Sequence, residues 1–207
     1  MGRSPRLPSR TGCFHVVARG NNQQNVFLEE GDFLAYRDLL CEYGTKYLVA
    51  MHHYCLMSNH VHLVLKAADF QGVSRFMHDV QRSYVLFRWR KERFSGHLWQ
   101  GRFRSFSIEE ESYLLECGRY VERNPVRAGI VRDPGDYPWS SYAAYAFGKK
   151  DLVVTVSPLY AGMGKTPEER QMCYRTYVRV TRPSEAPGTK SPYGTRYRRG
   201  ARYLVPG

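Results

Sequence analysis

The fold of this chain is decided by residues 45–66, which have the sequence TKYLVAMHHYCLMSNHVHLVLK. The apolar stretch 45–55 predicts one β-strand, and the alternating stretch 60–66 predicts a second. Ser58 and Asn59 lie between them and favour a tight turn. The two strands are therefore expected to pair as an antiparallel hairpin.

The elements on either side of this hairpin define the fold class. They are expected at residues 12–18 (strand), 31–43 (helix), about 70–93 (helix), near 102–108 (strand) and about 109–123 (helix). The order strand, helix, strand, strand, helix, strand, helix predicts an α+β fold, with a ferredoxin-like antiparallel sheet and helices packed on one face. A further helix is expected from about residue 165, because Thr166, Pro167 and Glu169 form a helix-start pattern.

The charge of the chain indicates a polyanionic partner. The formal net charge is +12, which favours nucleic acid. An anionic membrane is the rival partner, but no basic amphipathic helix supports it and no apolar run approaches the roughly 20 residues that span a bilayer. The five cysteines are odd in number and form no Cys-x-x-Cys pair, which indicates reduced thiols in a cytoplasm and argues against a structural zinc site. The basic residues 1–10 lack the apolar stretch of a secretory signal.

A pair of histidines at the start of the second hairpin strand suggests a metal site. Alternation along a strand places His60 and His62 on the same face, where two imidazoles can share one ion. The pattern alone is weak, because a strand can carry incidental histidines. The polar turn before it and the apolar residues after it would hold such ligands rigidly. His15, in the first strand, is a second-tier candidate.

Tyr120 and Asn124 form a second candidate pair. Their four-residue spacing puts them on one helix face, one turn apart. A phenol oxygen becomes a nucleophile when its charge is stabilised, and a metal-bound phosphate supplies that setting. The Asn124 carbonyl could serve as a third, hard ligand. Tyr113 is less suitable, because eleven residues of helix place it about 16 Å from Asn124.

A cluster of cationic and aromatic side chains is the expected DNA surface. Cations bind phosphates, and aromatic rings stack on unpaired bases. The alternative is a solvated basic helix end with Trp99 in the core. The predicted DNA-binding residues are Arg88, Arg90, Lys91, Arg93, Trp99, Arg102 and Arg104.

These segments together resemble the REP-associated tyrosine transposases, a branch of the HUH single-tyrosine transposases. The stretch 57–64 (MSNHVHLV) resembles the HUH motif, and 96–103 (GHLWQGRF) and 119–129 (RYVERNPVRAG) resemble later blocks. His15, residues 19–21 and residues 139–142 fit the start and the end. The resemblance covers about residues 12–145.

The resemblance implies a mechanism and a set of site residues. His60 and His62 would bind Mg²⁺ or Mn²⁺, and Tyr120 would attack a phosphate of single-stranded or hairpin DNA to form a 5′-phosphotyrosine link and free a 3′-OH. Asn124 stands where insertion-sequence relatives have glutamine. Two alternatives remain open: a domesticated DNA-binding protein that does not cut, and a metal hydrolase that uses water as the nucleophile.

The chain is accordingly divided into four parts: a basic arm (1–10), a catalytic domain of the HUH tyrosine transposase type (11–148), an extension with a helix (149–180) and a disordered basic tail (181–207). The expected location is the cytoplasm of a bacterium, at the nucleoid. Either a monomer or a homodimer is compatible with the sequence.

Overall fold

The protein is built on a four-stranded antiparallel sheet. A computed structural model describes residues 9–110 and 112–180. The strand order is β2-β3-β1-β4. The strands are β1 (Cys13–Arg19), β2 (Ala50–Met57), β3 (His60–Lys66) and β4 (Arg104–Ile108).

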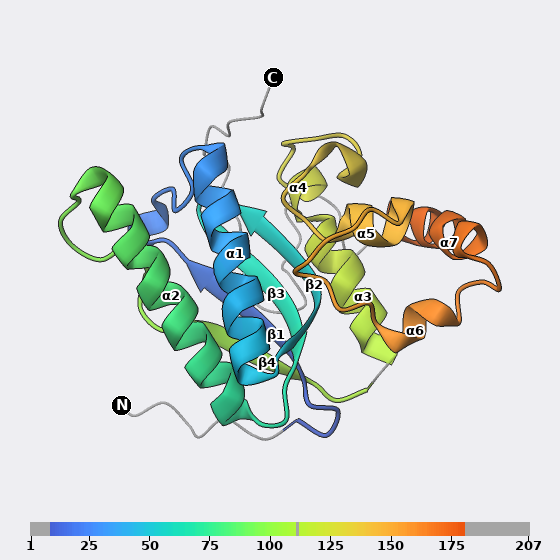
Figure 1. Cartoon of the computed structure of the whole chain (residues 1–207). Coiled ribbons are helices and arrows are strands. Elements are labelled where there is room, and N and C mark those ends of the chain that lie inside the picture. Colours follow the sequence, from blue (N-terminus) through green and yellow to red (C-terminus); the bar gives the residue numbers. More distant parts are fainter. Residues whose placement is uncertain (1–8, 111, 181–207) are drawn as a thin grey trace.

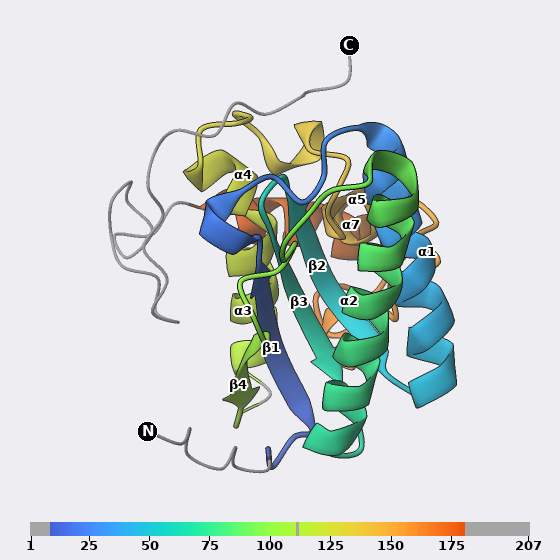
Figure 2. The same ribbon diagram turned by 90° about the vertical axis from the view of Figure 1, so that its left-hand side faces the viewer.

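The two long helices cover one face of this sheet. They are α1 (Glu30–Tyr47) and α2 (Phe70–Glu92), and they pack against each other (Figures 1 and 2). The connectivity β1-α1-β2-β3-α2-β4, with β1 and β3 adjacent in the centre, is the predicted ferredoxin-like arrangement. The opposite face is covered by α3 (Ser112–Glu122), which contacts β2 and β3 (Figure 2).

The remaining elements lie mostly beyond α3 (Figure 1). They are η1 (Asn21–Gln23), α4 (Asn124–Arg127), η2 (Pro134–Asp136), α5 (Tyr142–Phe147), α6 (Pro158–Ala161) and α7 (Pro167–Arg179). The predicted helix start is confirmed, because Thr166 and Glu169 form a capping box at the beginning of α7. A small apolar core, centred on Tyr145 and Tyr174, joins α5 to α7.

The alternation of β3 sorts its side chains between two different environments. Leu65 pairs with Phe14, whose ring contacts Phe70 of α2, so this face belongs to the apolar core under α1 and α2. His60 and His62 therefore face α3. The alternation of β3 thus places a row of buried histidines on the sheet face that α3 covers.

A β-bulge in β2 changes the face on which its histidines lie. Met51 pairs with Leu65, and the next paired residue is His53, opposite Val64. The extra residue, His52, places its Nδ1 atom 2.9 Å from the carbonyl oxygen of Thr155. The bulge thereby turns His53 toward α3 instead of toward the apolar core.

Two boundary predictions are wrong for local reasons. The first hairpin strand does not begin at residue 45, because α1 continues to Tyr47 and closes at Leu48, a left-handed residue whose amide donates to the last turn. The helix expected from about residue 109 begins at Ser112, because the chain needs the residues after β4 to turn out of the sheet. The predicted basic arm and tail lie almost wholly outside the described residues. No disulfide bond joins the five cysteines, all of which lie within the described residues. None of the helices in the described part of the chain is long and apolar enough to cross a bilayer.

Candidate active site

Three histidines form a buried row on the face of the sheet that α3 covers. The rings of His60 and His62 are perpendicular, with centroids 5.0 Å apart. Nδ1 of His62 lies 3.0 Å from Nε2 of His15, and the two rings stack. The structure thus brings His15 to the predicted pair, and the β1–β3 register is the physical reason for this proximity.

The hydrogen bonds of these histidines select the nitrogen that faces the site. Nδ1 of His60 lies 2.6 Å from the amide oxygen of Asn59, which can only accept, so Nδ1 carries the proton and Nε2 holds the lone pair. In His62 the contact to His15 likewise involves Nδ1. Partners of this kind fix the tautomer and orientation of metal-binding histidines. Nε2 is therefore the atom through which either ring would bind a cation.

Burial keeps all three imidazoles neutral at physiological pH. Desolvation lowers the pKa of His15 to about 3, and desolvation together with the nearby charge of Arg19 lowers the pKa of His60 to about 3. The pKa of His62 is held well below its ordinary value, first by burial and then by the neighbouring histidines and arginines. Neutral imidazoles have the lone pairs that metal binding requires.

Tyr120 approaches the histidine row from α3. Its side chain is 4% exposed, and its ring lies edge-on to His62 and His15, at centroid distances of 6.0 and 6.1 Å. The structure therefore brings the predicted nucleophile to the predicted metal ligands. Tyr113 is 57% exposed on the first turn of the same helix.

Asn124 has a structural task in addition to its predicted role. Its amide nitrogen donates to the carbonyl oxygens of Tyr120 and Val121, each at 3.0 Å, where Pro125 prevents regular helical bonding. α3 therefore ends at Glu122, and Asn124 opens α4. In the described part of the chain no hydrogen bond joins Asn124 to the histidines, and its carbonyl oxygen is the atom that could reach a cation.

Two arginines, Arg19 and Arg127, lie beside this site. The sequence analysis did not name either as a site residue, although both lie in segments that resemble the family. Arg19 pairs with His60 across β1 and β3, so their side chains share a face. The guanidinium carbon of Arg127 lies 4.8 Å from the centroid of the Tyr120 ring. The seven-residue separation of Tyr120 and Arg127, about two helical turns, is the signal that could have found the second arginine.

The comparison with known protein families identifies the chain. The family model described as "Transposase IS200 like" matches residues 10–124, which is more than half of the sequence. The chain belongs to the IS200-like transposases. This is a family of DNA-processing enzymes. No curated protein matches the chain.

Solved structures add a likeness of fold. A REP-associated tyrosine transposase bound to a REP hairpin has a TM-score of 0.61 and 15% sequence identity, covering 76% of this chain and 93% of that one. A protein of Deinococcus radiodurans described as a transposase has a TM-score of 0.40 and 17% identity, covering 59% of this chain and 95% of that one. At 15% identity the first comparison supports the fold alone.

Two of the predicted DNA-binding residues of this IS200-like transposase have structural roles instead. Arg88 is 3% exposed, bonds Glu92 at 2.7 Å and lies 3.5 Å from the buried carboxylate of Asp32. Trp99 is 8% exposed in the core, where its ring lies against Tyr36 and Tyr84. The sequence pattern did not reveal the burial of Arg88, whereas the core position of Trp99 is the alternative that the sequence had left open. Neither side chain is placed to contact DNA.

The other members of that cluster remain exposed. Lys91 is exposed yet forms ion pairs of 2.7 Å with Glu29 and Asp32. Arg93 lies over the ring of Trp89, with 4.2 Å between the guanidinium carbon and the ring centroid. The side chains still available to DNA phosphates are Arg90, Arg93, Arg102 and Arg104, with Lys91 after loss of its ion pairs.

A buried polar network ties the Tyr120 helix to α7 of the transposase. Glu122, fully buried, accepts from Ser141 at 2.6 Å and from the phenol of Tyr174 at 2.7 Å, and it contacts Nδ1 of His53 at 3.0 Å. Gly118 makes room for this histidine, since a Cβ there would lie 2.5 Å from the imidazole ring.

The last turn of α7 is held by two arginines of the α3 region. Arg119 donates from Nε to the carbonyl oxygen of Tyr177 at 2.9 Å, and Arg123 donates to those of Val178 and Arg179 at 2.8 and 3.1 Å. The last carbonyls of a helix lack partners within the helix, so these bonds complete its end. The sequence interpretation missed this network, although the Arg119, Glu122 and Arg123 spacing marks one helical face.

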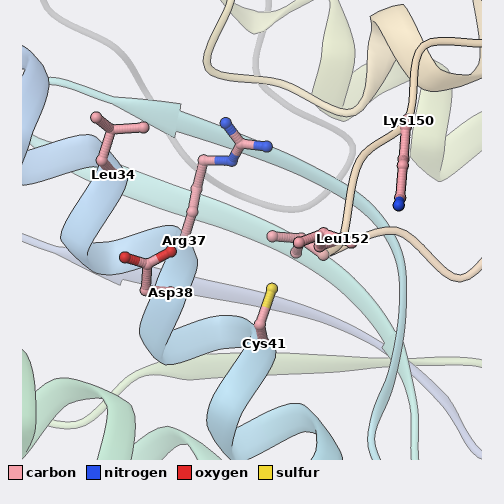
Figure 3. A pocket seen from close by; sticks show the side chains of 7 residues that line it. Leu34, Arg37, Asp38, Cys41, Lys150 and Leu152 are labelled. Atoms are coloured by element: carbon pink, nitrogen blue, oxygen red, sulfur yellow. The ribbon is translucent and has the colours of Figure 1, made fainter.

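A separate hollow lies on the α1 side of the sheet, away from the histidine row. This pocket, of about 390 Å³, has one wall from α1 and the other from residues 150–153 (Figure 3). Arg37 on one wall is bound to Asp151 at 3.1 Å. The pocket therefore has a structural ion pair at its rim and no contact with Tyr120.

Proposed function

We propose that this chain is a metal-dependent endonuclease and transposase that cuts and rejoins single-stranded, hairpin-associated DNA through a 5′-phosphotyrosine at Tyr120. The observation that carries the proposal is the position of Tyr120, edge-on to His62 at 6.0 Å on the polar face of the sheet. A phenol and neutral imidazoles converge there beside two arginines. Membership of the IS200-like transposases supports the same chemistry.

In the proposed reaction Tyr120 is the nucleophile. Its phenol oxygen forms a bond to phosphorus while the bond from phosphorus to the 3′ oxygen breaks. The phenol proton is lost, and the departing 3′ oxygen gains a proton to become the free 3′-OH. Rejoining reverses these changes, with a 3′-OH attacking the phosphotyrosine. Because the intermediate keeps the energy of the phosphodiester, strand transfer needs no other energy source.

The donor set fits a divalent cation that is incompletely held by protein. No group of three His, Cys, Asp or Glu side chains suited to a metal occurs in residues 9–110 and 112–180. The Nε2 atoms of His60 and His62, with the Asn124 oxygen as a third candidate, would hold Mg²⁺ or Mn²⁺ and leave positions for DNA oxygens. When bound, the cation polarises the phosphoryl oxygens. The histidines themselves orient it, and burial excludes water from their faces.

The DNA partner is proposed from charge and from the similar fold. The net charge of +12 and the exposed arginines after α2 favour a polyanion. The similarly folded REP-associated tyrosine transposase is bound to a REP hairpin. We extend hairpin DNA to this chain as the first substrate to test.

The decisive experiment compares Tyr120→Phe with Tyr113→Phe on a panel of hairpin-bearing single strands. Tyr120→Phe should bind DNA normally but neither cleave it nor form an adduct that survives denaturation. Tyr113→Phe should do both, because this side chain is on the solvent side of α3. Peptide mass spectrometry then locates the adduct. An adduct on another tyrosine refutes the assignment, cleavage without any adduct favours a water nucleophile, and binding without cleavage by the parent protein favours a domesticated binder.

The metal is tested by single replacement of its two principal ligands. His60→Ala and His62→Ala should each abolish cleavage that depends on Mg²⁺ or Mn²⁺, with circular dichroism unchanged. Normal cleavage by both variants in excess chelator would contradict a metal at these histidines.

A further inference from the structure

Arg127 occupies a position that its fellow arginines do not share. It lies on α4, seven residues after Tyr120, and its guanidinium covers the tyrosine ring at 4.8 Å from the ring centroid. The backbone amide of Arg127 bonds the carbonyl of Arg123 at 2.9 Å, which fixes α4 to the end of the catalytic helix. The backbone of α4 therefore places the Arg127 side chain against the Tyr120 ring.

The donors of Arg127 are buried without a protein acceptor. Its Nε and Nη1 atoms have no hydrogen-bond partner within residues 9–110 and 112–180, and no carboxylate there pairs with it. The neighbouring Arg123 bonds the last carbonyls of α7 through Nη1, and Arg88 bonds Asp32 and Glu92. Buried cationic donors without acceptors are costly, so they are found where a ligand supplies the acceptor.

The charge around this arginine indicates an anionic ligand. Arg19 and Arg127 both act electrostatically on His62, from β1 and from α4 respectively. A group that lies between Tyr120 and His62 is thus exposed to two positive charges. The planar fork of a guanidinium matches the oxygens of a phosphate, and charge-assisted bonds of this type are the stronger ones.

We propose that Arg127 is a catalytic residue that binds a non-bridging oxygen of the scissile phosphate, using the Nε and Nη1 donors. This inference rests on the proposed function of Tyr120. The guanidinium stacks on the ring of the attacking residue, so the same contact would align phosphorus with the phenol oxygen. It would also stabilise the negative charge that the phosphoryl oxygens carry during the transfer.

The test is a double-perturbation cycle, in which replacement of Arg127 is combined with replacement of the phosphate oxygen that it is proposed to bind. Arg127→Ala should slow the cleavage of an ordinary phosphodiester by about 10²–10³-fold, the range for loss of one preorganised donor. On a substrate with a methylphosphonate at the scissile linkage, one diastereomer has a methyl group in place of the oxygen facing Arg127. The variant should cleave this diastereomer about as fast as the parent protein does. A methylphosphonate at the neighbouring linkage should leave the full defect.

A binding version of the cycle covers the case in which the neutral linkage is cut too slowly to measure. In a Tyr120→Phe background, which keeps the ring, Arg127→Ala should weaken binding of the phosphodiester DNA about tenfold. It should not weaken binding of the scissile methylphosphonate. Arg75→Ala, at an exposed arginine near the start of α2, is the matched control and should match its parent in both assays.

Several results would overturn the proposal. A structural role in packing Tyr120 predicts the same loss on both substrates, and a contact to a different phosphate predicts rescue at the neighbouring linkage. Full restoration by Arg127→Lys would show that charge alone suffices and that the fork is not used. The proposed function itself is judged separately, by whether the parent protein forms the Tyr120 adduct.

Discussion

Acid should destabilise this protein through its buried histidines. His15 and His60 are 0% and 2% exposed, and burial lowers the pKa of each from 6.5 to about 3. In the unfolded chain the same imidazoles take up a proton near pH 6.5. Between these two pH values the unfolded state therefore binds more protons than the native state, and stability falls as the pH falls. Above about pH 6.5 this contribution to stability is fully present.

The size of the effect follows from the two pKa values. Going from about pH 7.5 to about pH 5, each histidine lowers the free energy of unfolding by about 2 kcal/mol, or about 4 kcal/mol for His15 and His60 together. His62 adds to this loss, because its pKa is lowered in the same direction. Since domains are stable by roughly 5–15 kcal/mol in total, such a loss is readily measured.

The assay is urea unfolding at the two pH values, in chelator so that no cation holds the imidazoles. His60→Gln removes one titrating group, so its loss of stability on acidification should be about 2 kcal/mol smaller than that of the parent. His78→Gln is the control, because the side chain of His78 is 69% exposed and hydrated in both states. Superimposable pH dependences for the parent and His60→Gln would refute the argument that burial keeps this imidazole neutral.

Four further substitutions test the scaffold and the exposed basic surface. Gly118→Ala should lower the free energy of unfolding by about 1–3 kcal/mol, although alanine favours helices, because its Cβ would lie 2.5 Å from a buried imidazole; thermal melting measures the sign. Tyr174→Phe should cost about 1–3 kcal/mol in urea unfolding, because its phenol donates to the buried side chain of Glu122; a loss like that of an exposed tyrosine would contradict a contribution from this hydrogen bond. Arg88→Ala should destabilise by about 3–5 kcal/mol, whereas Arg90→Ala should leave stability unchanged and weaken DNA affinity, with a salt slope reduced by about one.

The fold could be predicted because its pattern is local. The alternation in residues 60–66 fixes which face each side chain takes, and the two helical periods on either side of the hairpin fix the order of elements. The bulge at His52 was not predicted, since one inserted residue leaves no mark on composition. The left-handed Leu48 was missed for a related reason, because an apolar residue at a helix end resembles the start of a strand.

The candidate residues that the sequence pattern brings together are close neighbours along the chain, whereas contacts between distant segments could not be predicted. His60 and His62 share a strand, and Tyr120 and Asn124 are one turn apart. Arg88 was misassigned because the carboxylate that buries it, Asp32, is 56 positions earlier in the chain, a separation that no local pattern encodes.

The buried polar network between the α3 region and α7 can form only after both segments have been synthesised. The ribosome makes Tyr120 before it makes Tyr174, whose phenol bonds Glu122, and before the carbonyl groups that Arg119 and Arg123 bind. At about 5–20 residues per second this interval lasts several seconds. During this interval α3, the helix that carries Tyr120, lacks the hydrogen bonds that α7 supplies. We therefore expect a nascent or prematurely terminated chain to hold Tyr120 less rigidly against the histidine row than the full chain does.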